Sequence, residues 1–353
     1  MSKICIIGTS NIKHISLISL YTRFFEENGI DYDIIYIDRY GIEEQTKAAN
    51  VYKFRLDNME SRLGKLQGFR KFRSFVKRTV KNNSYELLIT WQSTTAYILA
   101  DFLLGKYKNR YIVNIRDYIA ESNPLFKRLL GRLVNKSAFT TISSEGFLEF
   151  LSKGDYLKVN SINEELLSGI DVQHHEPQVP YKIGFAGNCR YFREAYRLID
   201  ALANDKRFEL WYCGTNSEVL KEYAANNNIK NVFTEGAFDP GKTVELMSRF
   251  DMINSAFGSD AFDNRTLLPI RLYTAAAMSL PVLASAGSKL GSVIGENGIG
   301  YVIEAFDTLP DSLAGYFASI DNSILSSACE AFLDRCRAEN ERFYQKLRET
   351  AGE

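Results

Sequence analysis

The chain has 353 residues, 45% of them hydrophobic and 24% charged, with a formal net charge of zero. This composition is typical of a globular protein, and the length predicts about two domains. No segment approaches the roughly 20 apolar residues that a bilayer span needs, and the apolar run at residues 4–7 is too short for an export signal.

The first half alternates between short apolar strands and helical stretches. Its first strand ends in Gly8, and residues 9–11 are followed by a helical stretch to about Asn28. Because the strands are continuously apolar and helices separate them, we expect a parallel, doubly wound sheet. The predicted strands are residues 3–8, 33–38, 87–90, 111–115, 139–143 and 157–160.

The same alternation starts again after a polar segment, residues 171–180, which we interpret as a linker. Two Rossmann-like halves in one chain predict a cleft between domains, with ligands at the carboxyl ends of the strands. Apolar residues at helical spacing predict a last helix over residues 325–348. The predicted strands of this half are residues 181–187, 208–213, 231–234, 252–257, 281–285 and 300–303.

Residues 266–285 (TLLPIRLYTAAAMSLPVLAS) form the most informative segment. An apolar run from Ile270 to Met278 predicts a buried helix, which Pro281 must end because proline cannot continue it. The following residues, PVLAS, predict a buried parallel strand. A helix this apolar is expected to turn its amino-terminal N–H groups to a cleft, where they can hold an anion. An ordinary core helix and strand is the alternative.

The sequence PIRLY at residues 269–273, followed by LPVLAS, resembles the donor-site segment of GT-B glycosyltransferases of family 4. Those enzymes use nucleotide sugars, and many of them build bacterial surface polysaccharides. The resemblance implies a GT-B fold with an acceptor domain over residues 1–172, a donor domain over 173–320, and a terminal helix over 321–353. It also implies sugar transfer with retention of configuration. The two glutamates of the family fall on Thr266 and Thr274, so both carboxylates are missing.

The resemblance implies a donor site after the first strand of the second half, where Gly187 precedes two arginines. Arg190 and Arg193 are the expected catalytic cations, because guanidinium groups pair with phosphate oxygens and stay charged. Surface arginines at a helix start are the alternative. The donor-binding residues predicted in all are Gly8, Thr9, Gly187, Thr266, Leu267, Leu268, Pro269, Arg271 and Thr274.

Asp117 follows a strand of the first half, where family members often have a His-Asp pair facing the reacting sugar. Arg116 occupies the histidine position. A carboxylate there can orient the acceptor or stabilise a developing positive charge, which makes Asp117 the third catalytic candidate. A cap of the next segment is an equally good interpretation.

Residues 62–81 (RLGKLQGFRKFRSFVKRTVK) hold eight basic residues and no acidic one, with apolar residues from Leu63 to Val80 on one helical face. Such a helix is typical of a surface that rests on anionic lipid, although a core-packed helix with a solvated basic face competes with this interpretation. Nucleic acid is not expected, because no binding module accompanies the charge. The predicted membrane contacts are Arg70, Lys71, Arg73, Lys77 and Arg78.

The charges of the two halves differ in sign. Residues 1–175 carry 25 Lys and Arg against 19 Asp and Glu, whereas residues 176–353 carry 18 against 24. This asymmetry suggests that one half faces an anionic partner. The partners we expect are a nucleotide-sugar donor, a saccharide or lipid-linked saccharide acceptor, and an anionic membrane surface.

Neither a cofactor nor a metal ion is expected, since arginines would supply the positive charge and three histidines make a structural zinc site improbable. The five cysteines are scattered, so we expect reduced thiols and a cytoplasmic protein, peripheral on the inner membrane face if it binds lipid. Residues 236–243 (GAFDPGKT) match the phosphate-binding P-loop pattern, but we interpret them as a turn before a helix. Two other functions remain open: a catalytically silent GT-B subunit and a sugar-nucleotide epimerase.

Overall fold

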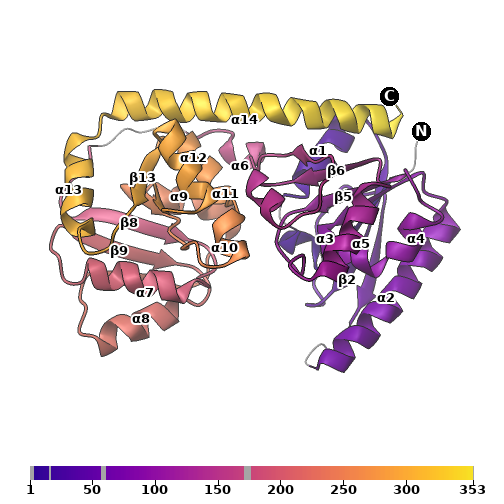
Figure 1. Ribbon diagram of the computed structural model, residues 1–353, viewed down its shortest axis with the longest axis horizontal. Coiled ribbons are helices and arrows are strands. Elements are labelled where there is room, and N and C mark those ends of the chain that lie inside the picture. The colour runs from indigo at the N-terminus through magenta and orange to yellow at the C-terminus, as the bar shows by residue number, and fades with distance from the viewer. Residues whose placement is uncertain (1–3, 16, 57–60, 171–175, 353) are drawn as a thin grey trace. The chain divides into compact units, whose positions relative to one another are not determined.

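The computed structural model describes residues 4–15, 17–56, 61–170 and 176–352. The chain forms two compact units, one of Met1–Asn160 with Glu339–Glu353 and the other of Ser161–Ala338 (Figure 1). The chain therefore leaves the first unit at Asn160 and returns to it at Glu339. The first five residues of the predicted linker, 171–175, lie outside the described residues.

The first unit contains a seven-stranded sheet in the order β3-β2-β1-β4-β5-β6-β7, and every pair of neighbouring strands is parallel. The doubly wound sheet predicted from the sequence is confirmed. Its strands are β1 (Ile4–Gly8), β2 (Tyr32–Asp38), β3 (Asn50–Arg55), β4 (Leu87–Trp91), β5 (Tyr111–Ile115), β6 (Phe139–Ile142) and β7 (Leu157–Lys158). The edge strand β3 was not predicted, because half of its residues are polar and it is nowhere fully buried.

Helices cover both faces of this sheet, and α3 packs against both α2 and α5. The helices are η1 (Ile12–His14), α1 (Ser19–Glu27), α2 (Arg62–Asn83), α3 (Gln92–Ile98), α4 (Ala100–Leu104), α5 (Pro124–Val134) and η2 (Glu145–Glu149). The helical stretch predicted between residues 9–11 and about Asn28 ends as expected with α1 but is not continuous. A short 3₁₀ turn comes first, and Leu17 has a left-handed backbone (φ 58°), which interrupts a helix.

The last helix, α14 (Asn322–Ala351), is continuous and belongs to both units (Figure 1). Its final part completes the core of the first unit, where Phe343 and Leu347 are fully buried and the Phe343 ring contacts Tyr21. The Asn340 side chain accepts a hydrogen bond from the backbone N–H of Asn160 and donates one to its backbone oxygen.

The second unit contains a six-stranded parallel sheet in the order β10-β9-β8-β11-β12-β13. From β8 the chain adds β9 and then β10 on one side, and it then adds β11, β12 and β13 in turn on the other side of β8. The direction in which strands are added therefore reverses between β8 and β11. Ligands bind at such a switch point in open parallel sheets. The strands are β8 (Tyr181–Ala186), β9 (Phe208–Cys213), β10 (Val232–Glu235), β11 (Met252–Asn254), β12 (Val282–Ser285) and β13 (Gly300–Ile303).

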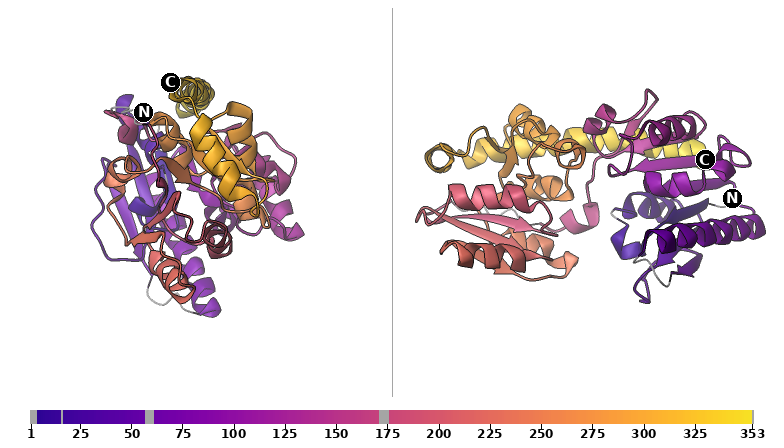
Figure 2. Two further views of the ribbon diagram at one scale, coloured as in Figure 1. Left: turned by 90° about the vertical axis from the view of Figure 1, so that its left-hand side faces the viewer. Right: turned by 60° about the horizontal axis from the view of Figure 1, so that its bottom comes forward.

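Helices lie on both faces of this second sheet (Figure 2). Two apolar clusters pack on it, one beneath α9, α11, α12 and α14 and the other beneath α7, α8 and α13. The helices are α6 (Glu164–Leu167), α7 (Phe192–Ala201), α8 (Ser217–Asn226), η3 (Pro240–Lys242), α9 (Thr243–Met247), α10 (Phe262–Thr266), α11 (Ile270–Ala277), α12 (Lys289–Asn297) and α13 (Leu309–Ser319). The buried helix and strand predicted from residues 266–285 are present as α11 and β12. Within the described residues, no helix combines the length and the hydropathy of a membrane span.

Candidate functional site

The loop after β8 leaves the carboxyl end of the sheet next to the switch point. Its first residue, Gly187, has a positive φ of 142°. A Cβ atom at this position would lie 2.8 Å from Nη2 of Arg271. Glycine therefore permits both this backbone conformation and the close approach of a guanidinium group to the loop.

Arg271 lies in the first turn of α11 and brings a charged group into apolar surroundings. Its guanidinium carbon is 4.0 Å from the ring centre of Phe185 and 5.3 Å from that of Phe257. Its Nη1 atom is buried and has no hydrogen-bond partner among the described residues. Burial, with a smaller contribution from the charge of Arg190, lowers the pKa of Arg271 to about 10. An anion at this place would supply both the missing hydrogen-bond acceptor and the missing charge.

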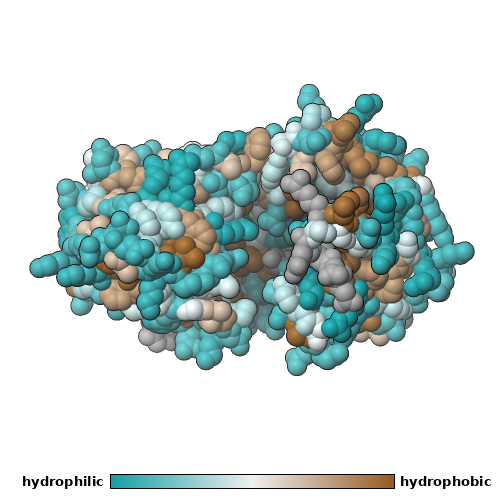
Figure 3. Space-filling model, turned by 90° about the horizontal axis from the view of Figure 1, so that it is seen from below, coloured by the Kyte–Doolittle hydropathy of each residue, from teal (hydrophilic) through white to brown (hydrophobic). Residues whose placement is uncertain are grey.

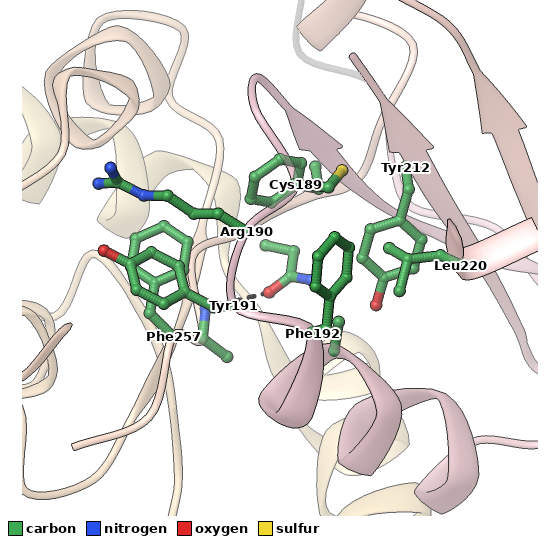
Figure 4. Close-up of a pocket in the computed structure, with 11 residues that line it drawn as sticks. Cys189, Arg190, Tyr191, Phe192, Tyr212, Leu220 and Phe257 are labelled. Atoms are coloured by element: carbon green, nitrogen blue, oxygen red, sulfur yellow. Dashed lines mark hydrogen bonds between the residues drawn. The ribbon is translucent and has the colours of Figure 1, made fainter. Parts of the chain in front are cut away.

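Arg190 is the second cation of the loop. Its side chain is exposed, its guanidinium carbon lies 5.0 Å from the ring centre of Tyr191, and no ion pair engages it in the described part of the chain. In Figure 4 it extends past the rings of Tyr191 and Phe257, away from Cys189 and Tyr212. The Tyr191 ring lies 4.9 Å from the Phe257 ring, which Arg271 also contacts, so the two guanidinium groups lie against neighbouring aromatic rings after β8.

Arg193 is placed differently. Its side chain is 75% exposed and its Nη1 lies 2.6 Å from an oxygen of Asp260, in the loop after β11. Glu194, which is buried, lies 3.9 Å away and pairs more closely with Arg197. The structure therefore brings Arg190 and Arg271 together and holds Arg193 in an ion pair with Asp260.

The two threonines at the family's glutamate positions are both buried. Thr266 donates its hydroxyl to the backbone oxygen of Phe262, and Thr274 donates to that of Ile270 at 3.4 Å, so each hydroxyl bonds to its own helix. Leu267 is extended, Leu268 is buried, and Pro269 precedes the first turn of α11 as its N-cap. These three residues carry the chain into the helix that holds Arg271.

A pocket with an empty volume of about 310 Å³ opens beside the same loop (Figure 4). Five of its lining residues are aromatic: Phe185, Tyr191, Phe192, Tyr212 and Phe257. Burial raises the pKa of the Cys189 thiol, which also lines the pocket, to about 11, so this thiol is neutral at physiological pH. Aromatic walls limit the access of water, which strengthens the interaction between a guanidinium group and an anion.

The first unit carries the remaining predicted residues at the carboxyl end of its own sheet. Gly8 is the last residue of β1 and Thr9 follows it, and the Thr9 backbone oxygen accepts a 2.9 Å hydrogen bond from Arg39. Asp117 follows β5, is exposed, and accepts a 3.2 Å hydrogen bond from the Gln92 side chain.

Sequence reasoning missed Glu121, which fixes the loop that carries Asp117. Its carboxyl group is fully buried. One oxygen accepts hydrogen bonds from the hydroxyls of Ser93 (2.7 Å) and Tyr97 (3.1 Å), and the other accepts from the backbone of Ile119 (2.7 Å) and Ala120 (2.8 Å). The only available signal was the polar run after a buried strand, which does not distinguish a buried carboxylate from an exposed one.

The predicted membrane-contact residues of α2 fall into two groups. Arg73 and Lys77 pair with Asp101 at 2.5 and 2.6 Å, whereas Arg70, Lys71 and Arg78 are exposed. The predicted apolar face is buried only in its second part, where Phe72, Val76 and Val80 pack into the core. Leu63 and Leu66, at the start of the same face, are 74% and 50% exposed. The apolar face is therefore packed into the core in its second part and exposed in its first turns.

At the level of sequence, no family and no curated protein matches this chain significantly. Solved structures do. Sucrose-phosphate synthase from Thermosynechococcus elongatus is 11% identical, with 99% of each chain covered and a TM-score of 0.73. The chain has the GT-B fold. A glycosyltransferase from Rickettsia africae is 12% identical over 99% of both chains, with a TM-score of 0.69. HepE from Anabaena, solved in complex with UDP-glucose, is 12% identical over 99% of this chain and 100% of its own, with a TM-score of 0.67.

Proposed function

We propose that the protein is a metal-independent glycosyltransferase that moves a sugar from a nucleotide diphosphate to a hydroxyl of a saccharide acceptor. The observation that carries the proposal is the pair Arg190 and Arg271, two cations without a carboxylate partner among the described residues. They lie at the carboxyl end of β8, next to the switch point of a parallel sheet, where phosphorylated ligands bind. The UDP-glucose complex of the structurally similar HepE supports a nucleotide sugar as the ligand.

The pair would act on the leaving group. As the bond between the sugar's anomeric carbon and the phosphate oxygen breaks, negative charge grows on the diphosphate, and a cation placed there stabilises the transition state more than the ground state. In this proposal Arg271 and Arg190 supply the charge that a metal ion supplies elsewhere. Arg193 would join them only by leaving Asp260.

The first unit would bind the acceptor, which we propose to be a lipid-linked saccharide used in surface polysaccharide synthesis. Asp117 is exposed at the carboxyl end of β5, on the loop that Glu121 anchors. A carboxylate there would orient the acceptor hydroxyl, whose oxygen bonds to the anomeric carbon as the bond to the phosphate oxygen breaks and whose proton passes to the departing diphosphate. Retention of the anomeric configuration is part of the proposal through the resemblance to family 4.

A thermal-unfolding panel of nucleoside diphosphates and nucleotide sugars tests the donor assignment. A ligand that binds only the folded protein raises the unfolding midpoint, by an amount that grows with concentration relative to Kd. We expect nucleotides of one base to raise the unfolding midpoint of the wild type in the presence of a metal chelator. The same nucleotides should not raise the midpoint of the double variant Arg190→Ala/Arg271→Met. If no nucleoside diphosphate raises the midpoint of the wild type, the proposal is wrong.

A catalytically silent GT-B subunit is the second candidate. The observation that favours it is the state of Thr266 and Thr274, which present no carboxylate and direct their hydroxyls to helix carbonyls. Such a subunit would bind a nucleotide sugar in the same panel yet form no product with any acceptor. Sugar transfer by the isolated protein, followed as release of nucleoside diphosphate that depends on acceptor, would exclude it.

A further inference from the structure

Exposed large apolar side chains are concentrated at one edge of the first unit. Seven of the described residues of this kind belong to it, and each lies in a segment that follows a strand: Tyr40, Leu63, Leu66, Ile119, Leu125, Phe126 and Leu148. Because the sheet is parallel, segments that follow its strands meet at its carboxyl edge. The described residues of the second unit include three, Val179, Phe233 and Ile324, which are scattered.

The two most exposed of the seven, Leu125 and Leu63, lie at the starts of two helices of one layer, and Leu66 lies one turn after Leu63. Leu63 and Leu66 belong to the first turns of α2, and Leu125, 78% exposed, is the second residue of α5. Both helices pack against α3, so they flank it in the same layer, and both begin at the carboxyl edge of the sheet. The space-filling view shows apolar surface between hydrophilic side chains on the face of this unit turned to the viewer, in the right half (Figure 3).

Within α2 and α5 themselves the charged side chains have one sign. Neither α2 nor α5 contains an acidic residue. Lys65, Arg70 and Lys71 are exposed on α2, and Arg128 is exposed on α5. Exposed leucines among lysines and arginines match the interfacial region of a bilayer with acidic headgroups, where apolar side chains enter the acyl boundary and cations face phosphate.

We infer that the amino-terminal ends of α2 and α5 dock on an anionic lipid surface, with Leu63, Leu66 and Leu125 entering its interfacial region. This inference rests on the proposed function, in which the acceptor is lipid-linked. It also changes which residues are expected to contact the membrane. Arg73 and Lys77 are engaged by Asp101 within the fold, so the leucines and the exposed cations near the start of α2 make the contact instead.

The test is sedimentation of the full chain with vesicles of phosphatidylcholine, with and without phosphatidylglycerol, in the absence of any sugar donor. We expect the wild type to bind only the acidic vesicles and to be released by salt. The variant Leu63→Ser/Leu66→Ser/Leu125→Ser should bind at least about tenfold more weakly, because each buried leucine contributes on the order of tenfold in affinity. Arg70→Glu/Lys71→Glu should weaken binding in low salt.

Ile324→Ser is the matched control, since Ile324 is 68% exposed but lies in the second unit, and it should bind like the wild type. Unfolding midpoints confirm that the variants are folded, because the substituted side chains are exposed. Equal binding to neutral vesicles, or wild-type binding by the triple serine variant, overturns the inference. So does self-association of the wild type that the three serines abolish without any lipid binding, since the occupant is then a second copy. Donor affinity measured without vesicles separates this outcome from failure of the proposed function.

Discussion

Glu121 and Arg271 make an instructive comparison, because each lies near the carboxyl end of its own parallel sheet and has buried charged atoms: the whole carboxyl group of Glu121 and the Nη1 atom of Arg271. Glu121 accepts four hydrogen bonds from its own unit. Arg271 has a buried Nη1 with no hydrogen-bond partner in the described part of the chain, and aromatic rings lie against its guanidinium group.

The difference separates a residue that serves the fold from one that serves a ligand. A buried polar group that is fully hydrogen-bonded stabilises the structure around it, whereas one left without partners destabilises the free protein. Evolution tolerates the second arrangement where binding or catalysis needs it, at some loss of stability. We therefore expect substitutions at the two sites to have opposite signatures in stability and in donor affinity.

The largest effect is expected for Arg271→Met. Two hydrogen bonds from one guanidinium group to a phosphate contribute about 1.5–3 kcal/mol each, so affinity for the nucleoside diphosphate should fall on the order of a hundredfold or more. The unfolding midpoint of the free protein should stay the same or rise, because a buried charge without a partner is removed. Calorimetry and thermal unfolding measure the two quantities. Arg249→Met, which removes an arginine paired with Glu235, is the control and should leave affinity unchanged.

Glu121→Gln should show the reverse signature. The amide places an NH₂ group against donors that now point at a carboxylate, so we expect a loss of about 1–3 kcal/mol in the free energy of unfolding. Donor affinity should not change, since the residue belongs to the other unit. Denaturant unfolding beside calorimetry makes the test, with Glu86→Gln, at an exposed carboxylate, as the control. Weakened donor binding with intact stability would break the comparison.

Arg190→Ala should reduce donor affinity about tenfold, less than Arg271→Met. Its side chain is exposed, so water competes for its hydrogen bonds and screens its charge. Raising the salt concentration should weaken donor binding by the wild type more than by this variant. An affinity loss as large as that of Arg271→Met would contradict this prediction, because the exposed arginine would then contribute as much to donor binding as Arg271.

The smallest effect is expected at Arg193, whose exposed ion pair with Asp260 contributes roughly 0–1 kcal/mol. Arg193→Ala should change donor affinity by no more than about fivefold. The exchanged variant Arg193→Asp/Asp260→Arg should bind donor like the wild type if the pair only joins two loops. If the exchange abolishes binding while the fold is retained, Arg193 contacts the diphosphate as the sequence suggested.

Much of the fold was predictable because hydrophobic burial determines it. Strands such as β5 are continuously apolar, and a strand buried on both faces has to be. β3 escaped prediction because an edge strand is half exposed and its sequence, NVYKFR, is mixed. The return of the chain to the first unit at Glu339 was predictable only from the family resemblance, since helical spacing says nothing about which core a helix joins.

The site was predictable in position but not in its pairings. Gly187, Arg190 and Arg271 meet at the end of β8, as the topology of a parallel sheet requires. Whether a given arginine is free depends on residues far away in sequence: Asp260 engages Arg193, and no carboxylate of the described chain engages Arg190. Such pairings follow from loop conformation, which periodicity and composition do not encode.

The division of α14 between the units has a consequence for synthesis on the ribosome. Residues 1–160 emerge first, yet their core is completed by Phe343 and Leu347, which are translated after the whole second unit. The apolar surface that these side chains cover stays exposed while about 180 further residues are synthesised, which takes at least several seconds at typical elongation rates. The second unit, continuous from Ser161 to Ala338, has no such wait. The second unit can therefore complete its fold before the first unit does. We expect chaperones to bind the first unit during synthesis.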